Sequence, residues 1–447
     1  MNKRIRSAKE KIETLMYAHP KGYDLNLQRI SVLLEKLGNP QERIPPVIHV
    51  AGTNGKGSTI AFMRSILEAN GLAVHVHTSP HIFSWHERYR IGQYKGKGKF
   101  VDDEKLSIAI DKVAAANGNQ NITVFEILVA VMFILFSENP ADVSLVEVGL
   151  GGRLDATNVI HNPAITVITP ISFDHEALLG EKLSEIAFSK AGIIKNNVPV
   201  IVSAQKDEVI KIIEQQASYR LAPIQIMNQN YLGLEKNGQL IYQDKKEFLS
   251  LPLPRMYGSH QISNATVAIS AVRALSHKVG FSLTQKALER GILEAEWLGR
   301  MQRIKQGPLI NMFPQGSEVW LDGGHNPGAA KVIADFMKEL EKKERKKLIL
   351  ICGMLKTKDA SGYFNEFKCL AKEVLTVSIK SRTSSYNAEE LSRIAYKCGL
   401  KTLPFPSLYD AMLFIKNHTK REKSRILICG SLYLVNNTMT LNEITSL

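Results

Sequence analysis

The residues best suited to chemistry in this sequence lie in a glycine-rich stretch, Val47 to Thr59, which reads VIHVAGTNGKGST. An apolar run precedes the glycines and an apolar-periodic segment follows them, which predicts a strand, a loop and a helix in that order. Glycines let the backbone approach an anion closely, and the N–H groups at a helix start donate to phosphate oxygens. We therefore predict a nucleotide-phosphate site made of Gly52, Thr53, Asn54, Gly55, Lys56, Gly57, Ser58 and Thr59.

Lys56 and the hydroxyl residues at the end of this loop define its expected chemistry. Lys56 would place a positive charge near the β- and γ-phosphates, and Ser58 or Thr59 would help to hold Mg²⁺. Gly57 stands directly after the lysine, where the common phosphate-loop pattern has Ser or Thr. A glycine-rich turn with a surface lysine is therefore an alternative interpretation, and other parts of the chain must decide between the two.

Three polar residues outside the loop lie at or just beyond the ends of predicted strands: Ser79, Glu147 and His175. In α/β sheets, ligands bind at the carboxyl ends of the parallel strands. Glu147 interrupts an apolar strand, and a buried carboxylate needs a cation, a metal or several donors, so Arg153 is an alternative partner for it. His175 alone is more typical of a satisfied loop residue. Together, the hydroxyl, carboxylate and imidazole predict a divalent metal site suited to Mg²⁺ or Mn²⁺.

Two further groups of residues are candidates for the same site. Lys190 lies on a predicted helix just after the metal region, although a plain surface lysine is the alternative. Asp322 and His325 follow a predicted strand in the second half of the chain. Asn326 suits a helix N-cap followed by Pro327 at the first helical position, but capping does not account for Asp322 or His325.

The order of apolar segments predicts the fold that positions these residues. Short apolar runs alternate with helical segments, which favours an α/β fold with a mostly parallel sheet. We predict a phosphate-loop nucleotide-binding domain over 1–297 and a smaller Rossmann-like α/β domain over 298–447. The predicted strands are 47–50, 72–77, 143–149, 164–171, 198–203, 319–322, 347–353, 374–379 and 426–430. Helices are predicted at 103–116, 123–136, 183–192 and 259–275. Residues 1–44 are also predicted to be helical, with a break at 19–22. A small hairpin is predicted within 224–256.

Composition narrows the class of protein further. The chain has 447 residues, enough for two or three domains, and 44% of them are hydrophobic. The 57 basic against 43 acidic residues give a net charge of +14, which favours anionic partners, either nucleic acid or small polyanions such as nucleotides. The 4 cysteines show no CxxC spacing, so we expect neither a zinc site nor disulfides. No apolar run reaches the ~18 residues of a membrane span, and we expect a cytoplasmic protein.

Taken in order, the motifs of this chain resemble those of one known family. The sequence contains GTNGKGS (52–58), TSPH (78–81), EVGLGGRLDATN (147–158), DHxxxLG (174–180), KAGIIK (190–195), HQxxNA (260–265), GR (299–300), DGxHNP (322–327) and GSLYLV (430–435). Together they resemble the bifunctional dihydrofolate synthase/folylpolyglutamate synthase family, the folate branch of the Mur ligase superfamily. Gly57 after the lysine is typical of that branch.

The resemblance implies an activity and a set of ligands. ATP would phosphorylate a carboxylate of dihydropteroate or a folate, and the amine of L-glutamate would attack the acyl phosphate, releasing ADP and phosphate. A folate with several glutamates is polyanionic, so the basic excess does not require nucleic acid. The resemblance further implies no membrane partner, and we expect a monomer.

The resemblance also implies roles for individual residues. The implied metal ligands are Ser58, Ser79, Glu147, His175 and Lys190, with Lys190 carbamylated. The implied nucleotide contacts outside the loop are Asn264, Arg300 and Asp322. The implied catalytic residues are Lys56, His175, Lys190, Asp322 and His325.

Some residues depart from the family pattern, and other functions compete with the leading one. Ser189 stands where the family has a glutamate, Asn436-Asn437 replaces Gly-Glu, and residues 356–359 depart from an aspartate-rich turn. The alternatives are a single-activity folylpolyglutamate synthase, a ligase acting on a cell-wall precursor, and a nucleotide-binding protein acting on nucleic acid. The sequence lacks the interleaved aromatic and basic residues that single-stranded nucleic-acid binding uses, which disfavours the last.

Overall fold

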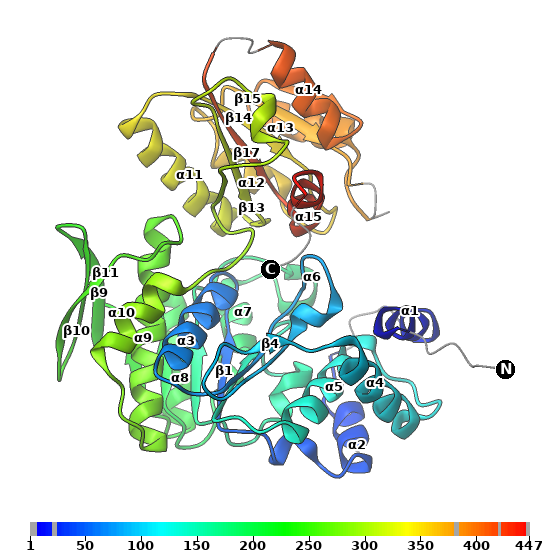
Figure 1. Cartoon of the computed structure of the whole chain (residues 1–447), viewed down its shortest axis with the longest axis vertical. Coiled ribbons are helices and arrows are strands. Elements are labelled where there is room, and N and C mark those ends of the chain that lie inside the picture. The colour runs from blue at the N-terminus through cyan, green and yellow to red at the C-terminus, as the bar shows by residue number, and fades with distance from the viewer. Residues whose placement is uncertain (1–6, 20–24, 380–383, 419–421, 444–447) are drawn as a thin grey trace. The chain divides into compact units, whose positions relative to one another are not determined.

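The computed structural model describes residues 7–19, 25–379, 384–418 and 422–443 (Figure 1). The chain forms two compact units. The first contains residues 1–171, 176–255 and 262–296, and the second contains 172–175, 256–261 and 297–447. Two short segments of the predicted first domain thus belong to the second unit. Among the described helices, none combines the length and apolar character that crossing a membrane requires.

The first unit is built on an eight-stranded sheet with the order β4-β3-β2-β5-β1-β6-β7-β8. Its strands are β1 Val47–Ala51, β2 Val74–His77, β3 Tyr89–Ile91, β4 Lys99–Phe100, β5 Val143–Glu147, β6 Ile165–Ile168, β7 Val200–Val202 and β8 Ile224–Ile226. The strands from β2 to β8 in this order are parallel, and β3 and β4 pair antiparallel at one edge. Since β1 lies between β5 and β6, the segments that follow these three strands emerge at the same edge.

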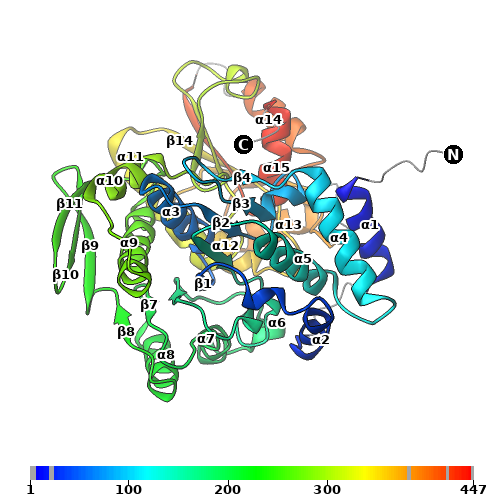
Figure 2. The same cartoon turned by 60° about the horizontal axis from the view of Figure 1, so that its bottom comes forward.

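Helices cover this sheet (Figure 2). Their apolar side chains contribute to separate core clusters. One cluster takes residues from α1 Ala8–Ala18, α2 Gln28–Lys36, α4 Asp103–Asn117 and α5 Val124–Glu138. Another takes residues from α7 Leu183–Ala191 and α8 Asp207–Tyr219. The remaining helices are α3 Lys56–Ala69, α6 Glu176–Leu179, α9 Ser259–Val279 and α10 Gln285–Glu294, with α10 packed on α3. The predicted break at 19–22 lies mostly outside the described residues, between α1 and α2.

The predicted hairpin within 224–256 is part of a three-stranded antiparallel sheet. Its strands are β9 Tyr231–Lys236, β10 Gln239–Asp244 and β11 Phe248–Pro252. Asn237 and Gly238 connect β9 to β10 with φ values of 53° and 75°. Positive φ at both central residues is the geometry of a type I′ turn, which matches the twist of paired strands.

The second unit has its own six-stranded sheet, in the order β12-β13-β17-β14-β15-β16. The strands are β12 Gln302–Ile304, β13 Glu318–Asp322, β14 Lys347–Cys352, β15 Glu373–Val377, β16 Thr402–Phe405 and β17 Ser424–Cys429. All pairs are parallel except β12 with β13. Its helices are α11 Pro327–Lys343, α12 Ala360–Asn365, α13 Ala388–Lys397, α14 Leu408–His418 and α15 Leu432–Leu441. Tyr257 packs against the buried Trp320 of this unit, with the two ring centroids 5.0 Å apart.

Candidate active site

The glycine loop connects β1 to α3, as predicted, and two of its glycines have no room for a side chain. A Cβ at Gly52, where φ is 151°, would lie 1.9 Å from Thr169 Oγ1. A Cβ at Gly55, where φ is 84°, would lie 2.7 Å from Asn264 Oδ1. The Thr53 backbone N–H donates to the Pro170 carbonyl at 2.9 Å. Close packing against the segment after β6 and against α9 therefore fixes the path of the loop.

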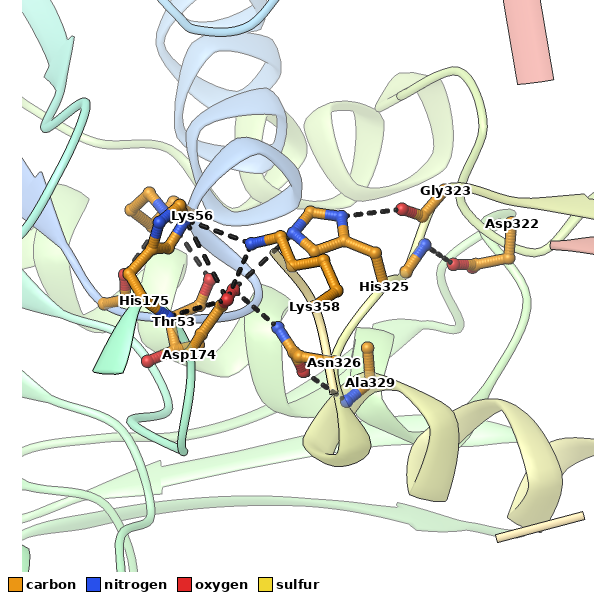
Figure 3. Close-up of polar contacts among 12 residues, drawn as sticks. Thr53, Lys56, Asp174, His175, Asp322, Gly323, His325, Asn326, Ala329 and Lys358 are labelled. Carbon is orange, nitrogen blue, oxygen red and sulfur yellow. Dashed lines mark hydrogen bonds and ion pairs between the residues drawn. The ribbon is translucent and has the colours of Figure 1, made fainter. Parts of the chain in front are cut away.

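Lys56 lies at the start of α3 and is held within the loop. Its Nζ donates to the carbonyl oxygens of Gly52 at 3.1 Å and Thr53 at 3.4 Å (Figure 3). The same Nζ lies 3.8 Å from Glu147 Oε1. Glu147, at the end of β5, is only 5% exposed, and its Oε2 accepts a hydrogen bond from the Ser79 N–H at 3.1 Å. A lysine and a backbone amide thus offset part of the cost of burying this carboxylate.

The alternative partner of Glu147 was Arg153, and the structure places Arg153 elsewhere. The guanidinium carbon of Arg153 lies 3.9 Å from the centroid of the Phe188 ring. Its Nη2 donates to Gln216 Oε1 at 3.5 Å. The ion pair of Glu147 is with Lys56 instead.

Lys190 reaches the same loop from the end of α7. Its Nζ donates to the Gly52 carbonyl at 3.0 Å, and the residue is only 6% exposed, so it is not a surface lysine. Lys56 and Lys190 therefore share one acceptor. The first unit thus brings together five of the predicted site residues, namely Gly52, Lys56, Ser79, Glu147 and Lys190, with Asn264 against Gly55.

The second unit contains a separate group of predicted residues centred on Asp174 (Figure 3). Lys358 Nζ donates to Asp174 Oδ1 at 2.6 Å, and it lies 3.1 Å from His175 Nε2. Asn326 Nδ2 donates to Asp174 Oδ2 at 3.1 Å, and His325 Nε2 lies 3.5 Å from the same oxygen. Asp174 therefore accepts from three side chains of this unit.

These contacts set the charge of Asp174. Burial works to raise the pKa of its carboxyl, but the hydrogen bond from His325 and the charges of His325, Lys358 and His175 outweigh burial. The net result is a pKa well below the usual range of an aspartate, so Asp174 is an anion at neutral pH. His175 beside it has a φ of 56°, a left-handed conformation that is uncommon for a non-glycine residue.

Asp322 and Arg300 also lie in the second unit. Asp322 accepts from the backbone N–H groups of Met301 at 2.8 Å and Gly324 at 2.7 Å. Burial raises the pKa of Asp322, with the charge of Arg300 opposing the shift. Asn326 accepts from the Ala329 N–H at 2.9 Å and caps α11, with Pro327 at its first position, which confirms the capping prediction.

Sequence reasoning missed two residues of this group. In the sequence, Asp174 belongs to the DHxxxLG motif and Lys358 lies in the departing segment 356–359, and neither is predicted as a site residue. Both follow strands, β6 and β14 respectively, and the same strand-end argument that identified His175 would have identified them. Among the described residues, no three His, Cys, Asp or Glu side chains form a metal-binding group. The predicted metal ligands, which include Ser and Lys, stay a prediction.

The architecture is that of a Mur-type ligase: it combines the glycine loop, the mostly parallel sheet and a second α/β unit. The model of the Mur ligase middle domain matches residues 50–272, and that of the dihydrofolate synthetase C-terminal domain matches residues 310–441. The chain is 30% identical over 431 residues to the dihydrofolate synthase/folylpolyglutamate synthase of Bacillus subtilis, covering 93% of this chain and 94% of that protein. The chain belongs to the dihydrofolate synthase/folylpolyglutamate synthase family.

Solved structures agree with this assignment. A structure of E. coli FolC in complex with DHPP and ADP superposes with a TM-score of 0.86 at 28% identity, covering 98% of each chain. A bifunctional folylpolyglutamate synthase/dihydrofolate synthase from Yersinia pestis, complexed with AMPPNP and a Mn ion, gives a TM-score of 0.84 at 26% identity, covering 97% of this chain and 98% of that one. The α/β fold predicted from the sequence is confirmed.

Proposed function

We propose that this protein is an ATP-dependent amide ligase that adds L-glutamate to dihydropteroate, forming dihydrofolate, and to the glutamate tail of folates. The observation that carries the proposal is the glycine loop with Lys56 and Lys190 converging on the Gly52 carbonyl, in a chain of this family. The relatives solved with ADP and with AMPPNP support an adenine nucleotide as a ligand of this protein.

The chemistry proceeds in two transfers. In the first, a carboxylate oxygen of the acceptor attacks the γ-phosphorus of ATP, an O–P bond forms, and the bond to ADP breaks. In the second, the glutamate amine attacks the acyl carbon, an amide C–N bond forms, and phosphate leaves with loss of a proton from nitrogen. Phosphoryl transfer depends mainly on positioning and on charge stabilisation. Loop N–H groups and Lys56 provide both at the γ-phosphate, and Asn264 and Arg300 are the proposed further nucleotide contacts.

The residues around Glu147 fit a magnesium ion. A buried carboxylate and the nearby serine residues offer hard oxygen donors, which Mg²⁺ and Mn²⁺ prefer. By resemblance to the family, the proposed ligands are Ser58, Ser79, Glu147, His175 and a carbamylated Lys190. When bound, the ion would neutralise charge on the phosphates. Carbamylation would turn this buried cation into an anionic ligand.

In the second unit, His325 and Asp322 are proposed to act on the glutamate side of the reaction. Asp174 orients His325 through its Nε2, and the Gly323 carbonyl lies 3.2 Å from its Nδ1. Burial lowers the pKa of His325, while its contact with Asp174 works in the opposite direction. Because both ring nitrogens face acceptor oxygens, we propose that this imidazole acts as a hydrogen-bond donor that positions the glutamate side of the site.

Release of ADP in the presence of L-glutamate, with dihydropteroate or tetrahydrofolate as acceptor, tests the proposal. Turnover with both acceptors is expected. The model that matches residues 310–441 is that of dihydrofolate synthetase, so an enzyme with one of the two activities is the second candidate, and turnover with a single acceptor would establish it. ADP release independent of glutamate would overturn the proposal.

A further inference from the structure

Three cations in the first unit lie together without a carboxylate to balance them. Arg153 follows β5, Lys195 follows α7, and Arg220 caps the carboxyl end of α8. Within the described part of the chain, none of the three forms an ion pair with an aspartate or glutamate. Buried or half-buried charges are normally paired, so this cluster needs an explanation.

The hydrogen-bond acceptors of these three cations are neutral oxygens. Arg220 Nη1 donates to Asn196 Oδ1 at 3.2 Å, and Lys195 Nζ donates to the Asn158 carbonyl at 3.1 Å. Arg153 Nη2 has only the long bond to Gln216 already described. The Nε atoms of Arg153 and Arg220 are buried and have no hydrogen-bond partner among the described residues. Two charged groups thus each retain an unused donor, which is costly unless an acceptor arrives.

The three side chains are close enough to affect one another. Burial and then the charge of Arg220 lower the pKa of Lys195 to about 8, and the same two causes lower the pKa of Arg153. Gln216, which Arg153 contacts, lies one helical turn before Arg220. Asn158 connects Arg153 and Lys195. Its Nδ2 donates to the Arg153 carbonyl at 2.9 Å, and its own carbonyl accepts from Lys195 Nζ.

Two members of the cluster, Lys195 and Arg220, lie away from the glycine loop, whereas Arg153 follows the carboxyl end of β5. Lys195 and Arg220 precede β7 and β8, at the amino ends of strands that run parallel to β6 and β1. The glycine loop follows the carboxyl end of β1, at the opposite edge of the sheet. The helices α7 and α8 end near the cluster, and the carboxyl terminus of each helix carries about half a negative charge. These partial charges attract the three cations but are together smaller than the cations' summed positive charge.

We propose that Arg153, Lys195 and Arg220 form a binding site for a small oxyanion, with inorganic phosphate as the representative ligand. Guanidinium groups bind phosphate oxygens through their N–H edges, and charge-assisted bonds of this kind are the strong ones. The ring of Phe188 packs against the Arg153 guanidinium, with the guanidinium carbon 3.9 Å from the ring centroid, and holds it in place. A bound anion would supply the counter-charge that Arg153, Lys195 and Arg220 lack among the described residues.

Thermal unfolding in chloride and in phosphate of equal ionic strength tests this site. The wild-type midpoint should rise with phosphate and saturate. Arg220→Gln keeps the side chain polar but removes the charge, and it should weaken the apparent phosphate affinity about tenfold or more. Lys195→Gln should act in the same direction, whereas Arg220→Lys should retain most of the response. Lys211→Gln, an exposed lysine on α8, is the matched control and should behave as wild type.

The comparison between variants separates this site from the glycine loop. Phosphate bound at residues 52–59 contributes equally to wild type and variants, so only the difference reports the cluster. An equal phosphate response in wild type and Arg220→Gln, or no response in wild type, would overturn the proposal. A midpoint lowered by the same amount in both salts would also overturn it, because that result describes a helix cap and not an anion site.

Discussion

Lys358 Nζ and Asp174 Oδ1 lie 2.6 Å apart, and their side chains are only 7% and 9% exposed. The two residues are 184 positions apart in the chain. Asp174 also accepts from Asn326 and contacts His325, while Lys358 contacts His175. This buried ion pair therefore holds together the segments that carry the predicted residues of the second unit.

Replacement of Lys358 by methionine should destabilise the protein strongly. Removing one partner of a buried ion pair leaves an uncompensated charge, which costs about 3–5 kcal/mol. The free energy of unfolding, measured with urea, should fall by that order. Lys356→Met is the matched control, because Lys356 pairs with Glu390 at 3.0 Å with 49% and 34% of the two side chains exposed. Water screens an exposed pair of this kind, so the control should change the free energy of unfolding far less. Equal losses in the two variants would contradict the importance assigned to the Asp174 pair.

Lys56→Ala should abolish most turnover. The variant lacks the charge proposed to stabilise the transferred phosphoryl group, and loss of one such group costs roughly 10²–10³ in kcat. ADP release with saturating acceptor and glutamate measures this effect. Lys331→Ala, which removes an exposed lysine on α11, serves as the control. Wild-type activity in Lys56→Ala would remove the phosphate-loop assignment.

Glu147→Gln should raise the Mg²⁺ concentration needed for half-maximal activity. The substitution keeps the shape of the side chain but removes the anionic oxygens proposed to bind the ion, and we expect a shift of about 10-fold or more. A Mg²⁺ titration of ADP release checks this, with Mn²⁺ as a second metal. An unchanged titration would exclude Glu147 as a ligand.

Carbamylation of Lys190 should make activity depend on CO₂. Enzyme stripped of CO₂ at slightly acidic pH should lose activity and recover it when bicarbonate is added, because the neutral amine adds CO₂ and releases a proton. Lys190→Arg cannot form this carbamate and should not recover. Mass spectrometry of the trapped carbamate gives a readout independent of activity. Full activity without CO₂ would show that the amine itself suffices.

Stability should fall as the pH falls below neutral because of buried histidines. Burial, followed by the charge of Lys195 for His49 and of Arg88 for His77, lowers both pKa values to about 3. The unfolded chain, with histidine pKa values near 6.5, binds more protons between these limits, so the stabilisation is complete above pH ~6.5 and is lost as the pH falls toward 3. Each histidine contributes about 1.4 kcal/mol per pH unit in that range.

Urea unfolding between about pH 5 and pH 6.5 measures this slope. His49→Gln should reduce this slope by about one proton, because the variant lacks one imidazole that is neutral when folded and protonated when unfolded. A wild-type free energy of unfolding that is constant over this range would contradict the neutral, buried state of these histidines.

The strands that the sequence did not predict are mostly those at the edges of the sheets. The central strands β1, β2, β5, β6, β13, β14, β15 and β17 appear where apolar runs predict them. The edge strands β4, β8, β12 and β16 have few residues buried, and β16 contains Pro404, which an edge tolerates because it needs fewer ladder donors. Apolar periodicity identifies buried strands well, and it has little to detect in strands that face solvent.

The site shows a similar division. Gly52, Lys56 and Glu147 could be predicted because strand order and loop composition place them at one edge of the sheet. The pairing of Glu147 with Lys56 in place of Arg153 depends on side-chain directions that spacing does not determine. The contact of Asp174 with Lys358 depends on tertiary packing across 184 residues, and no local pattern in the sequence encodes it.

The composition of the second unit has a consequence for how the protein is made. Residues 172–175 and 256–261 leave the ribosome well before the rest of that unit, which begins at Trp297. Asp174 can pair with Lys358, and Tyr257 can pack on Trp320, only after these later residues have been synthesised. A gene fragment that starts at Trp297 would encode a buried lysine without its carboxylate and a core tryptophan without its aromatic neighbour. The second unit is therefore not a transplantable module, and co-translational folding of the chain is completed only when its last third is synthesised.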